Sequence, residues 1–489
     1  MQLEAMQISF GILLALTCLV TAEIQATTDI YKIFRPVLSS EAQIYLASES
    51  DVEHVVPRWS TYKEPSYIAT IKPACEEDVQ SIITAASSHG IPFFVTGGGH
   101  SVKIGFATVQ NAVNIDMSNL KSIDLDLANN LVTVGSGVEN GPVYDLLSSV
   151  GKETPLTDDR CINTVGPTLG GGLSALYGIH GLLLDSLVSV RLVTAFGDAI
   201  TVSSTEHPDL FWAIRGAGFN FGAITSATYQ LYDQTNHGTR IQADFKHSPQ
   251  SNRSVIELFH SMDDEFPPEL YTSLTFSYSR TLHQPSISST LSFVGPPSAA
   301  QPWIDKFLAI DPIEASIKII PWHQRDEPGE PLCARGDHYS VYDVGLRQTD
   351  PAVLESYLNH LTQFSASNIW FDSKMVMERH ATDAVQAVPE SERGVYPWRD
   401  TKYDVYLLAK TPTAEYDDAM NAFMQPVRQE FHDTMGFDTL HVYVNQAFGD
   451  EGPEAWYGAH NLPRLVALKQ QWDPENKFGA GSPVPLSLD

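Results

Sequence analysis

Glycine-rich segments in the first half of the chain constrain its fold more than any other feature. They are Gly97-Gly98-Gly99-His100-Ser101, the stretch from Asn163 to Leu173 and the stretch from Pro208 to Gly222. Because glycine has no Cβ, backbone amides in such segments can approach a bound group closely. Successive amides form a concavity suited to an anion such as a diphosphate. Several such loops in one block favour a long ligand lying along the chain.

The first segment, taken alone, is weak evidence. Its spacing differs from the dinucleotide-binding fingerprint of the Rossmann fold, and no helix clearly follows it. A glycine cluster is equally well a tight loop, and a single histidine such as His100 is more often a hydrogen-bonded structural residue. The ligand hypothesis therefore depends on the glycine-rich segments together.

Residues 45–233 alternate short β-branched runs with stretches of helical periodicity. Helices are expected at 76–89 and 143–149, and strands at 66–71, 91–96, 112–116, 131–134 and 188–193. This alternation predicts an α+β block with two lobes, divided near residues 151–155.

Residues 234–436 have a different pattern, in which polar and apolar residues alternate as in half-buried strands. Strands are expected at 272–278, 289–294, 315–320, 338–344 and 403–409, and helices at 350–364 and 414–431. The pattern predicts an antiparallel sheet flanked by helices, with an open face available as a substrate wall. From Thr439 onward we expect one strand, one helix and a proline-rich tail.

The charge balance limits the classes of partner. The chain has 59 acidic and 30 basic residues, a formal charge of −29. A field of this sign repels phosphate backbones and anionic membrane surfaces, so nucleic acid is not an expected partner. Nothing in the sequence implies a protein partner, and solubility is a sufficient reason for the acidic surface.

The N-terminus has the pattern of a targeting segment. The apolar stretch Ile8–Val20 is too short for a comfortable transmembrane helix, and Val20-Thr21-Ala22 offers small residues for cleavage. Glu4 and the lack of an early Lys or Arg are atypical. We expect residues 1–22 to be a cleaved signal peptide, rather than an uncleaved anchor or a buried strand, and the protein to be secreted or to lie in the lumen of the secretory pathway. The sequon at Asn252 agrees with a secreted glycoprotein.

Cleavage after Ala22 would remove Cys18 and leave Cys75, Cys161 and Cys333. An odd number means that at least one cysteine is free, modified or paired between chains. We expect Cys75 and Cys333 to be core or surface thiols.

The order of the motifs resembles the vanillyl-alcohol oxidase superfamily, and within it the berberine bridge enzyme-like flavoproteins. The first glycine segment is similar to the family's GGH motif, and Pro208–Gly222 to its PDLFWALRGGGGNFG stretch. The closing segment from Tyr443-Val444-Asn445 to Phe478 is similar as well. The resemblance covers residues 45–233 and 439–478, and the middle block matches more weakly.

The resemblance implies a domain organisation and a cofactor. Residues 40–235 are expected to form a two-lobed PCMH-type FAD-binding domain, completed by residues 437–489, with a substrate-binding domain at 236–436. The family's histidine in the GGH motif is bonded to the flavin 8α-methyl, which implies covalent FAD at His100. The expected cofactor-binding residues are His100, Gly97, Gly98, Gly99, Ser101, Cys161, Val165, Gly166, Gly170, Gly171, Gly172, Gly218, Asn220, Gly222, Ile224 and Asn445.

Some relatives have a second flavin link through a cysteine shortly before the Val-Gly pair, for which Cys161 is the candidate here. One extra residue separates Cys161 from Val165-Gly166, and the following loop to Gly170 is shorter than usual. A free cysteine is also commonly a small buried hydrophobe. The sequence therefore favours a single link through His100 over a double one.

The proton acceptor is expected on a strand. Substrate oxidation needs a group that takes the O–H or N–H proton. In the family, an acidic or amide residue follows a Pro-x-Arg stretch, and the register after Pro397-Trp398-Arg399 puts Tyr406 there, with Asp404 on the same face. A tyrosine, with a pKa of about 10, needs neighbours that lower it, and a sheet-face aromatic residue with a satisfied hydroxyl is the commoner role.

Gln446 is the third catalytic candidate. It takes the place of the second tyrosine in the family's Tyr-x-Asn-Tyr motif, but an amide does not accept a proton as that tyrosine would. This departure argues against simple sugar-alcohol oxidation. Asn445 is expected to hydrogen-bond the flavin, and Tyr443 is either core or pocket.

Other titratable residues favour structural roles. His180 could line the pocket, but a structural histidine is the more common case. Glu378, Arg379, His380 and Asp383 include metal-ligand residue types, yet nothing nearby completes a ligand set, so no metal is expected.

We therefore expect an FAD-dependent oxidase. It would carry out a two-electron oxidation of a small organic molecule resembling a secondary metabolite, by hydride transfer to flavin N5, with O2 as acceptor and H2O2 as product. The lack of a strong base at Tyr406 and Gln446 leaves open a flavin-dependent oxidative cyclase that forms C–C bonds. A degenerate protein that only binds flavin or ligand is the non-enzymatic alternative.

Overall fold

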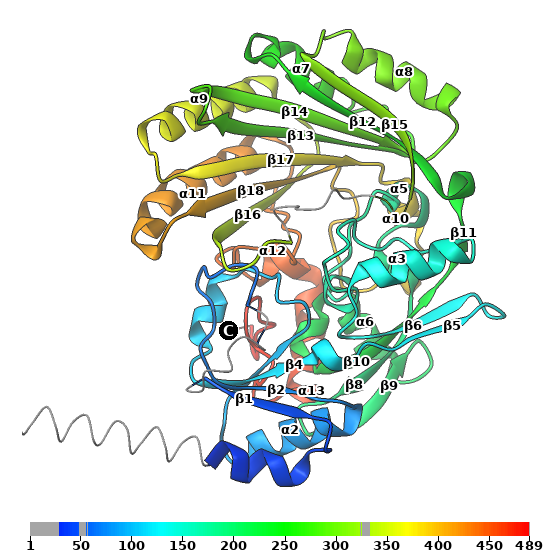
Figure 1. The fold of residues 1–489 in the computed structure, drawn as a ribbon, viewed down its shortest axis with the longest axis vertical. Coiled ribbons are helices and arrows are strands. Elements are labelled where there is room, and N and C mark those ends of the chain that lie inside the picture. The colour runs from blue at the N-terminus through cyan, green and yellow to red at the C-terminus, as the bar shows by residue number, and fades with distance from the viewer. Residues whose placement is uncertain (1–28, 48–54, 56, 323, 325–332, 489) are drawn as a thin grey trace, which may run out of the picture.

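The computed structural model describes residues 29–47, 55, 57–322, 324 and 333–488. Its strands form sheets of four, five and seven strands and a two-stranded ribbon. The seven-stranded sheet lies across the top of Figure 1, and the two smaller sheets lie below it. The expected signal peptide, residues 1–22, lies outside the described residues.

The first lobe contains the four-stranded sheet, in the order β1 (Gln43–Leu46), β2 (Tyr67–Lys72), β4 (Ala112–Asp116) and β3 (Phe93–Thr96). Both β2 and β3 run parallel to β4, so their carboxyl ends share one edge of the sheet. Helix α2 (Glu76–Ser88) buries Val79, Ile82 and Ile83 in the core of this lobe, and its first turn is acidic, which suits a helix N-terminus. The edge at the end of β3 carries the first glycine segment.

The second lobe contains the five-stranded antiparallel sheet. Its order is β5 (Ile123–Asp126), β6 (Leu131–Gly135), β10 (Ala223–Gln230), β8 (Leu187–Val193) and β9 (Ala199–Ser203). The accompanying helices are α3 (Asn140–Ser149), α4 (Val165–Thr168), α5 (Tyr177–His180), α6 (Pro208–Ala217), α12 (Pro453–Tyr457) and α13 (Leu462–Trp472). The C-terminal helices pack into the core of this lobe, so the chain ends by completing it.

Two sequence expectations for these lobes are wrong. The sheets divide between β4 and β5, not near residues 151–155, which include β7 (Lys152–Glu153) paired with β11 (Tyr232–Asp233). The expected strand after Thr439 is not formed, because Val442–Val444 is buried with no neighbouring strand to pair with in the described part of the chain. The amide of Tyr443 instead donates to the carboxylate of Asp343.

The seven-stranded sheet is antiparallel throughout. Its order is β15 (Glu314–Pro321), β12 (Thr239–His247), β14 (Gln284–Phe293), β13 (Leu270–Ser279), β17 (Asp372–His380), β18 (Tyr403–Thr411) and β16 (His338–Leu346). The helices α7 (Asn252–His260), α8 (Pro297–Leu308), α9 (Pro351–Ser367) and α11 (Asp417–Thr434) cover its outer face, and α10 (Asp383–Ala387) follows β17 (Figure 1). The sequence predicted the flanked antiparallel sheet correctly, but β12 and β17 were missed.

Alternation along the strands divides the residues of this sheet between two faces. Leu274, Met377 and Val405 belong to the core under the helices. Tyr271 of β13 belongs instead to the core of the second lobe, so the opposite face is turned toward the glycine-rich loops. Asp404 and Tyr406 lie on that inner face, because they alternate with Val405.

Short 3-10 helices connect many of these elements. They are η1 (Arg35–Val37), η3 (Ile104–Thr108), η4 (Met117–Asn119), η5 (Leu183–Ser186), η6 (Gly218–Asn220), η7 (Thr235–Gly238), η8 (Pro249–Ser251), η9 (Glu390–Glu392), η10 (Ala414–Tyr416) and η11 (Ala459–Asn461). Among the described helices, none has the length and apolarity needed to cross a bilayer.

Candidate functional site

The first glycine segment turns sharply as it leaves β3. Gly99 has a φ of +69°, a conformation in which a side chain is strained. The carbonyl of Gly99 accepts from Trp59 N at 3.0 Å, and the carbonyl of Gly98 accepts from Arg335 Nη1 at 2.8 Å. The amides of Gly98 and Gly99 donate no hydrogen bond to any described residue. This turn therefore presents two adjacent donors next to His100, the arrangement that binds an anion.

The second glycine segment lies against the first through Asn163. A Cβ at Gly98 would come within 2.9 Å of Asn163 Cβ, so only glycine allows this approach. Asn163 is fixed in turn: its Nδ2 donates to Ser136 O at 2.6 Å, and its Oδ1 accepts from Gly166 N at 2.9 Å. The structure thus brings Gly97–Ser101 and Val165-Gly166 together, although they are distant in sequence. Both ring nitrogens of His100 are screened from solvent.

Gly170–Gly172 contact the C-terminal segment directly. A Cβ at Gly171 would lie 2.8 Å from Tyr443 Cε2, and one at Gly170 would overlap the Asn445 amide. The hydroxyl of Tyr443 accepts from Gly172 N at 3.0 Å and from Asn445 Nδ2 at 2.7 Å. Burial raises the pKa of Tyr443 to about 12, against the lowering effect of these donors. The Asn445 side chain therefore links the second glycine segment to the C-terminal segment, and the Tyr443 side chain is a neutral phenol.

The third glycine segment is used for packing. Gly222 has a φ of +159°, and a Cβ there would lie 2.6 Å from Val193 O. The side chain of Asn220 is fully buried; Nδ2 donates to Tyr457 OH at 3.1 Å and Oδ1 accepts from Val484 N at 2.9 Å. Gly218 packs on Leu169, and Ile224 is buried in the core of the second lobe. The side chain of Asn220 is thus already hydrogen-bonded within the protein.

Cys161 is bonded to Cys333 at an S–S distance of 2.04 Å. The expectation that Cys333 is a thiol is therefore wrong. Cys161 cannot carry a second flavin link in this state, because its sulfur is already used. Among the described cysteines, Cys75 is the free one.

Carboxyl and phenol groups gather on the inner face of the seven-stranded sheet. Glu378 of β17 pairs in register with Asp404 of β18. Glu378 Oε1 accepts from Tyr271 OH at 2.8 Å and from Tyr406 OH at 3.4 Å. His380 Nε2 lies 3.6 Å from Glu378 Oε2. Two of the three catalytic candidates, Asp404 and Tyr406, thus lie together, and Glu378 joins them.

Burial shifts the acidities of this group. It raises the pKa of Asp404 to about 7; nearby His380 opposes the shift and Glu378 adds to it. Burial also holds the pKa of Tyr271 well above its ordinary value, with Glu378 adding to the effect. The side chain of Glu378 retains 18% exposure. Asp404 therefore gives this face a carboxyl group that gains and loses its proton near neutral pH.

Asp343 connects this face to the glycine-rich loops. It pairs in register with Tyr406, and its Oδ2 accepts from Tyr443 N at 2.6 Å. Burial holds the pKa of Asp343 well above its ordinary value, and the charge of Asp404 raises it further. Tyr443 thus lies between the carboxyl groups on the inner face of the sheet and the Gly170–Gly172 loop, and it hydrogen-bonds to both sides.

Gln446, the third catalytic candidate, lies at the end of the same C-terminal turn. Its amide nitrogen on the backbone donates to Tyr443 O at 2.8 Å. Its side-chain Oε1 is buried and accepts from no described residue. A buried acceptor without a donor is costly, so it is suited to a donor supplied by a ligand.

The Pro397–Arg399 stretch holds the strand that carries Asp404. Arg399 makes a two-pronged pair with Asp185, at 2.7 and 3.0 Å, and both side chains are buried. Trp398 Nε1 donates to Ala455 O at 2.7 Å. These contacts join β18 to the second lobe and to the C-terminal helices.

Sequence reasoning missed Glu378 and Asp343 as members of this face. Glu378 was noticed only as a metal-ligand residue type, and in the described chain no group of three His, Cys, Asp or Glu residues is placed to hold a metal ion. His180 lies outside the face; its Nε2 is 2.7 Å from buried Glu153 Oε1, and its ring stacks on Tyr232. A structural role accounts for these contacts of His180.

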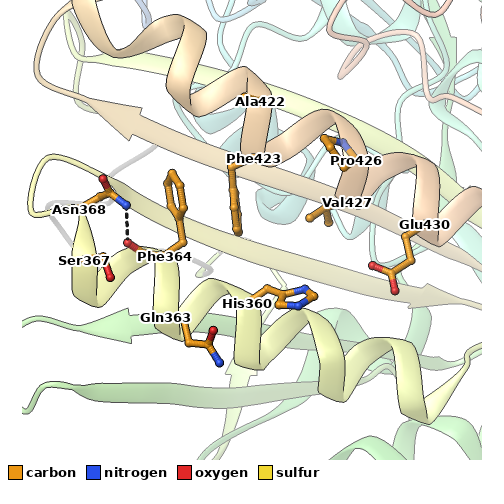
Figure 2. Close-up of a pocket in the computed structure, with 10 residues that line it drawn as sticks. All are labelled: His360, Gln363, Phe364, Ser367, Asn368, Ala422, Phe423, Pro426, Val427 and Glu430. Carbon is orange, nitrogen blue, oxygen red and sulfur yellow. Dashed lines mark hydrogen bonds between the residues drawn. The ribbon is translucent and has the colours of Figure 1, made fainter.

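A separate hollow lies on the outer side of the same sheet. A cavity of about 500 Å³ lies between α9 and α11. Its lining includes Phe364, Phe423 and Val427, together with His360 and Glu430 (Figure 2). Phe364 and Phe423 are stacked 4.3 Å apart. This hollow is across the sheet from Asp404 and Glu378 and contains none of the glycine-loop residues.

Comparison with known proteins agrees with this geometry. Residues 67–203 match the family model described as FAD binding domain, and residues 442–485 match the model described as berberine and berberine like. The FAD-linked oxidoreductase fmqD of Aspergillus fumigatus is 59% identical over 94% of both chains. The FAD-linked oxidoreductase tazL of Aspergillus terreus is 43% identical over 93% of this chain and 94% of its own.

Solved structures share the fold at low identity. Physcomitrella patens BBE-like 1 has a TM-score of 0.80 at 19% identity, covering 92% of this chain and 98% of that one. Glucooligosaccharide oxidase from Acremonium strictum has a TM-score of 0.78 at 18% identity, covering 91% and 96%. The two family models, the glycine-rich loops and the close fungal relatives lead to one assignment. The chain belongs to the berberine bridge enzyme-like family of FAD-linked oxidoreductases.

Proposed function

We propose that this enzyme is a secreted oxidase that removes two electrons from a small organic substrate, with FAD held covalently at His100 and O2 as the final acceptor. The observation that carries the proposal is the junction at Tyr443. The Tyr443 hydroxyl accepts from the Gly172 amide, and the Tyr443 backbone amide donates to Asp343 on the inner face of the seven-stranded sheet. A single residue thereby joins the cofactor loops to the acid–base groups.

The residues of the first glycine turn fit FAD. The amides of Gly98 and Gly99 lack acceptors among the described residues, which suits an anionic group of the cofactor. His100 follows directly, as an attachment point for the flavin. Bound FAD would supply the two-electron acceptor for the substrate C–H bond, with O2 then reduced to H2O2.

The inner face of the sheet supplies the proton acceptor. Tyr406 donates toward Glu378, so a substrate O–H or N–H at this hydroxyl can pass its proton to the carboxylate. Asp404, with a pKa of about 7, lies opposite Glu378 and sets the local charge. Gln446 Oε1 offers an acceptor that orients a donor group of the substrate.

These groups favour the oxidase over the cyclase. The argument for a cyclase was the lack of a strong base at Tyr406 and Gln446. Glu378 and Asp404 supply carboxyl groups within the same cluster, so the substrate proton has an acceptor. The reason for preferring a cyclase, which rearranges its substrate, is thereby removed. Unrearranged product with one H2O2 per turnover is the expected outcome.

Secretion is supported by the disulfide. Disulfides persist in oxidising compartments and are rare in the cytosol. The Cys161–Cys333 bond therefore suits a protein that enters the secretory pathway, as the N-terminal pattern indicates.

The direct test is to acid-precipitate the purified holoprotein and analyse its peptides by mass. We expect an FAD adduct on the peptide containing His100 and none on the peptide containing Cys161. His100→Ala should release all flavin into the supernatant, while His89→Ala, at the exposed end of α2, should retain the adduct. A colourless protein that takes up no flavin on reconstitution would contradict the proposal.

A further inference from the structure

A short segment of the substrate domain crosses the first glycine turn. We call residues 333–337 the strap. Arg335 Nη1 donates to Gly98 O at 2.8 Å and to Pro57 O at 3.1 Å. At its start, the strap is bonded to Cys161 through Cys333.

Residues 58–61 lie between the strap and the glycine turn. On one side, Gly336 N donates to Arg58 O at 3.1 Å, and Thr61 N donates to Asp337 O at 3.0 Å. On the other side, Trp59 N donates to Gly99 O at 3.0 Å. The strap thus reaches the turn both directly, through Arg335, and through this intermediate layer.

The other end of the disulfide reaches the same turn. Cys161 is two residues before Asn163, which packs so closely on Gly98 that a Cβ there would come within 2.9 Å. The disulfide spans 172 residues of sequence and joins the second lobe to the segment entering β16. Both of its cysteines therefore lie close in sequence to residues that contact Gly98.

The disulfide is open to reagents in solution. Cys333 and its neighbour Ala334 are exposed, and Cys161 is half-buried. Thiol–disulfide exchange requires that an attacking thiolate reach one sulfur, and an exposed disulfide meets this condition.

We propose that Cys161–Cys333 is a redox-modifiable site that controls access to the Gly97–Ser101 turn. A dithiol donates two electrons and two protons, the S–S bond becomes two thiols, and the reagent closes to a cyclic disulfide. The strap then loses its covalent link and is held by the hydrogen bonds of Arg335, Gly336 and Asp337 and the ion pair of Asp337 with Lys410, so the turn opens more often. The attachment of flavin to this turn rests on the proposed function, whereas the opening of the turn does not.

The test is hydrogen–deuterium exchange on the full-length holoprotein before and after dithiothreitol treatment and alkylation, with reduction verified by mass. We expect amide exchange in peptides covering 58–61 and 333–339 to rise about tenfold, because the amides of Trp59, Thr61 and Gly336 donate across the strap and the turn, with exchange in 403–411 unchanged. Trypsin cleavage after Arg335 should accelerate in parallel. Unchanged exchange in the two peptides of the fully reduced protein would overturn the proposal.

A matched pair of variants separates this disulfide from other thiol chemistry. Cys333→Ser should reproduce the faster exchange without reductant, whereas Cys75→Ser, which changes the free cysteine, should not. If Cys333→Ser fails to fold, reduction of the wild-type protein still decides the question. The exchange readout is independent of turnover, so it holds even if the flavin link at His100 is disproved.

Discussion

Glu378 and Asp404 lie directly opposite each other on the antiparallel strands β17 and β18, with Tyr406 hydrogen-bonded to Glu378 from two residues farther along. Two carboxyl groups at such a position disfavour simultaneous ionisation, because each raises the cost of charging the other. Burial and Glu378 together raise the pKa of Asp404 to about 7. The pair is therefore suited to hold and release one proton near neutral pH.

Replacing the Glu378 carboxylate should impair the chemical step. Glu378→Gln keeps the size of the side chain but removes the proton acceptor for Tyr406, so kcat/KM should fall by about 10²- to 10⁴-fold. The measurement is steady-state H2O2 formation with a substrate found by screening small hydroxylated and amine compounds. Glu257→Gln is the control, because Glu257 forms an exposed ion pair with Arg253 on α7. An unchanged rate for Glu378→Gln would exclude it as the acceptor.

The raised pKa of Asp404 also predicts how stability depends on pH. Between about pH 4 and 7 the folded protein holds a proton on Asp404 that the unfolded chain releases, so stability falls as pH rises through this window. Asp404→Asn removes this term, and its free energy of unfolding should exceed that of wild type above pH 7 by up to about 4 kcal/mol. Denaturant unfolding at pH 4.5 and 8 checks this, and a pH-independent difference would contradict it.

The sequence predicted the layers of the fold because periodicity reports burial. Leu274 and Phe276 on β13 alternate with polar residues, as a strand with one face under helices requires. Strand β17 escaped notice because it ends in Glu378-Arg379-His380, which resembles a solvated loop. Arg379 is in fact buried and donates to Met262 O at 3.3 Å, a partner that no local pattern reveals.

Only the part of the candidate site that contains a sequence motif could be predicted from the sequence. The glycine turn and His100 are visible in sequence, but the meeting of Glu378 with Tyr406 depends on the register between two strands. The disulfide joins cysteines 172 residues apart, so no spacing rule indicates it. One strand was expected from Thr439 onward, yet none is formed there, and the backbone amide of Tyr443 donates to the Asp343 carboxylate instead.

Gly170 should tolerate no side chain. A Cβ there overlaps Asn445, whereas a Cβ at Gly166 in the same segment meets Asn163 Oδ1 at an ordinary 3.6 Å. Neither glycine has a positive φ, so the comparison isolates the steric effect. Gly170→Ala should lower the free energy of unfolding by about 1–3 kcal/mol, as overpacked cores do, and Gly166→Ala by much less. Denaturant unfolding of the two flavin-free proteins measures both, and equal losses would contradict the packing described.

The Arg399–Asp185 pair should be a strong determinant of stability. Arg399→Met leaves the carboxylate of Asp185 buried without its cation, which typically costs about 3–5 kcal/mol. Lys246→Met is the control, because the Lys246–Glu314 pair is exposed and such pairs contribute about 0–1 kcal/mol. Thermal unfolding at low salt compares the two. Similar shifts in both variants would mean that Asp185 finds another partner when Arg399 is removed.

Gln446 should matter for the ligand and not for the fold. Its buried Oε1 has no donor among the described residues, so Gln446→Met removes an unsatisfied acceptor and should leave the flavin-free protein equally stable or more stable by about 1 kcal/mol. If a substrate donor is the missing partner, kcat/KM for that substrate should fall by about 10- to 100-fold. Gln429→Met on the exposed side of α11 controls for the substitution itself. A loss of stability without a change in kcat/KM would show that the acceptor serves the protein interior and not the ligand.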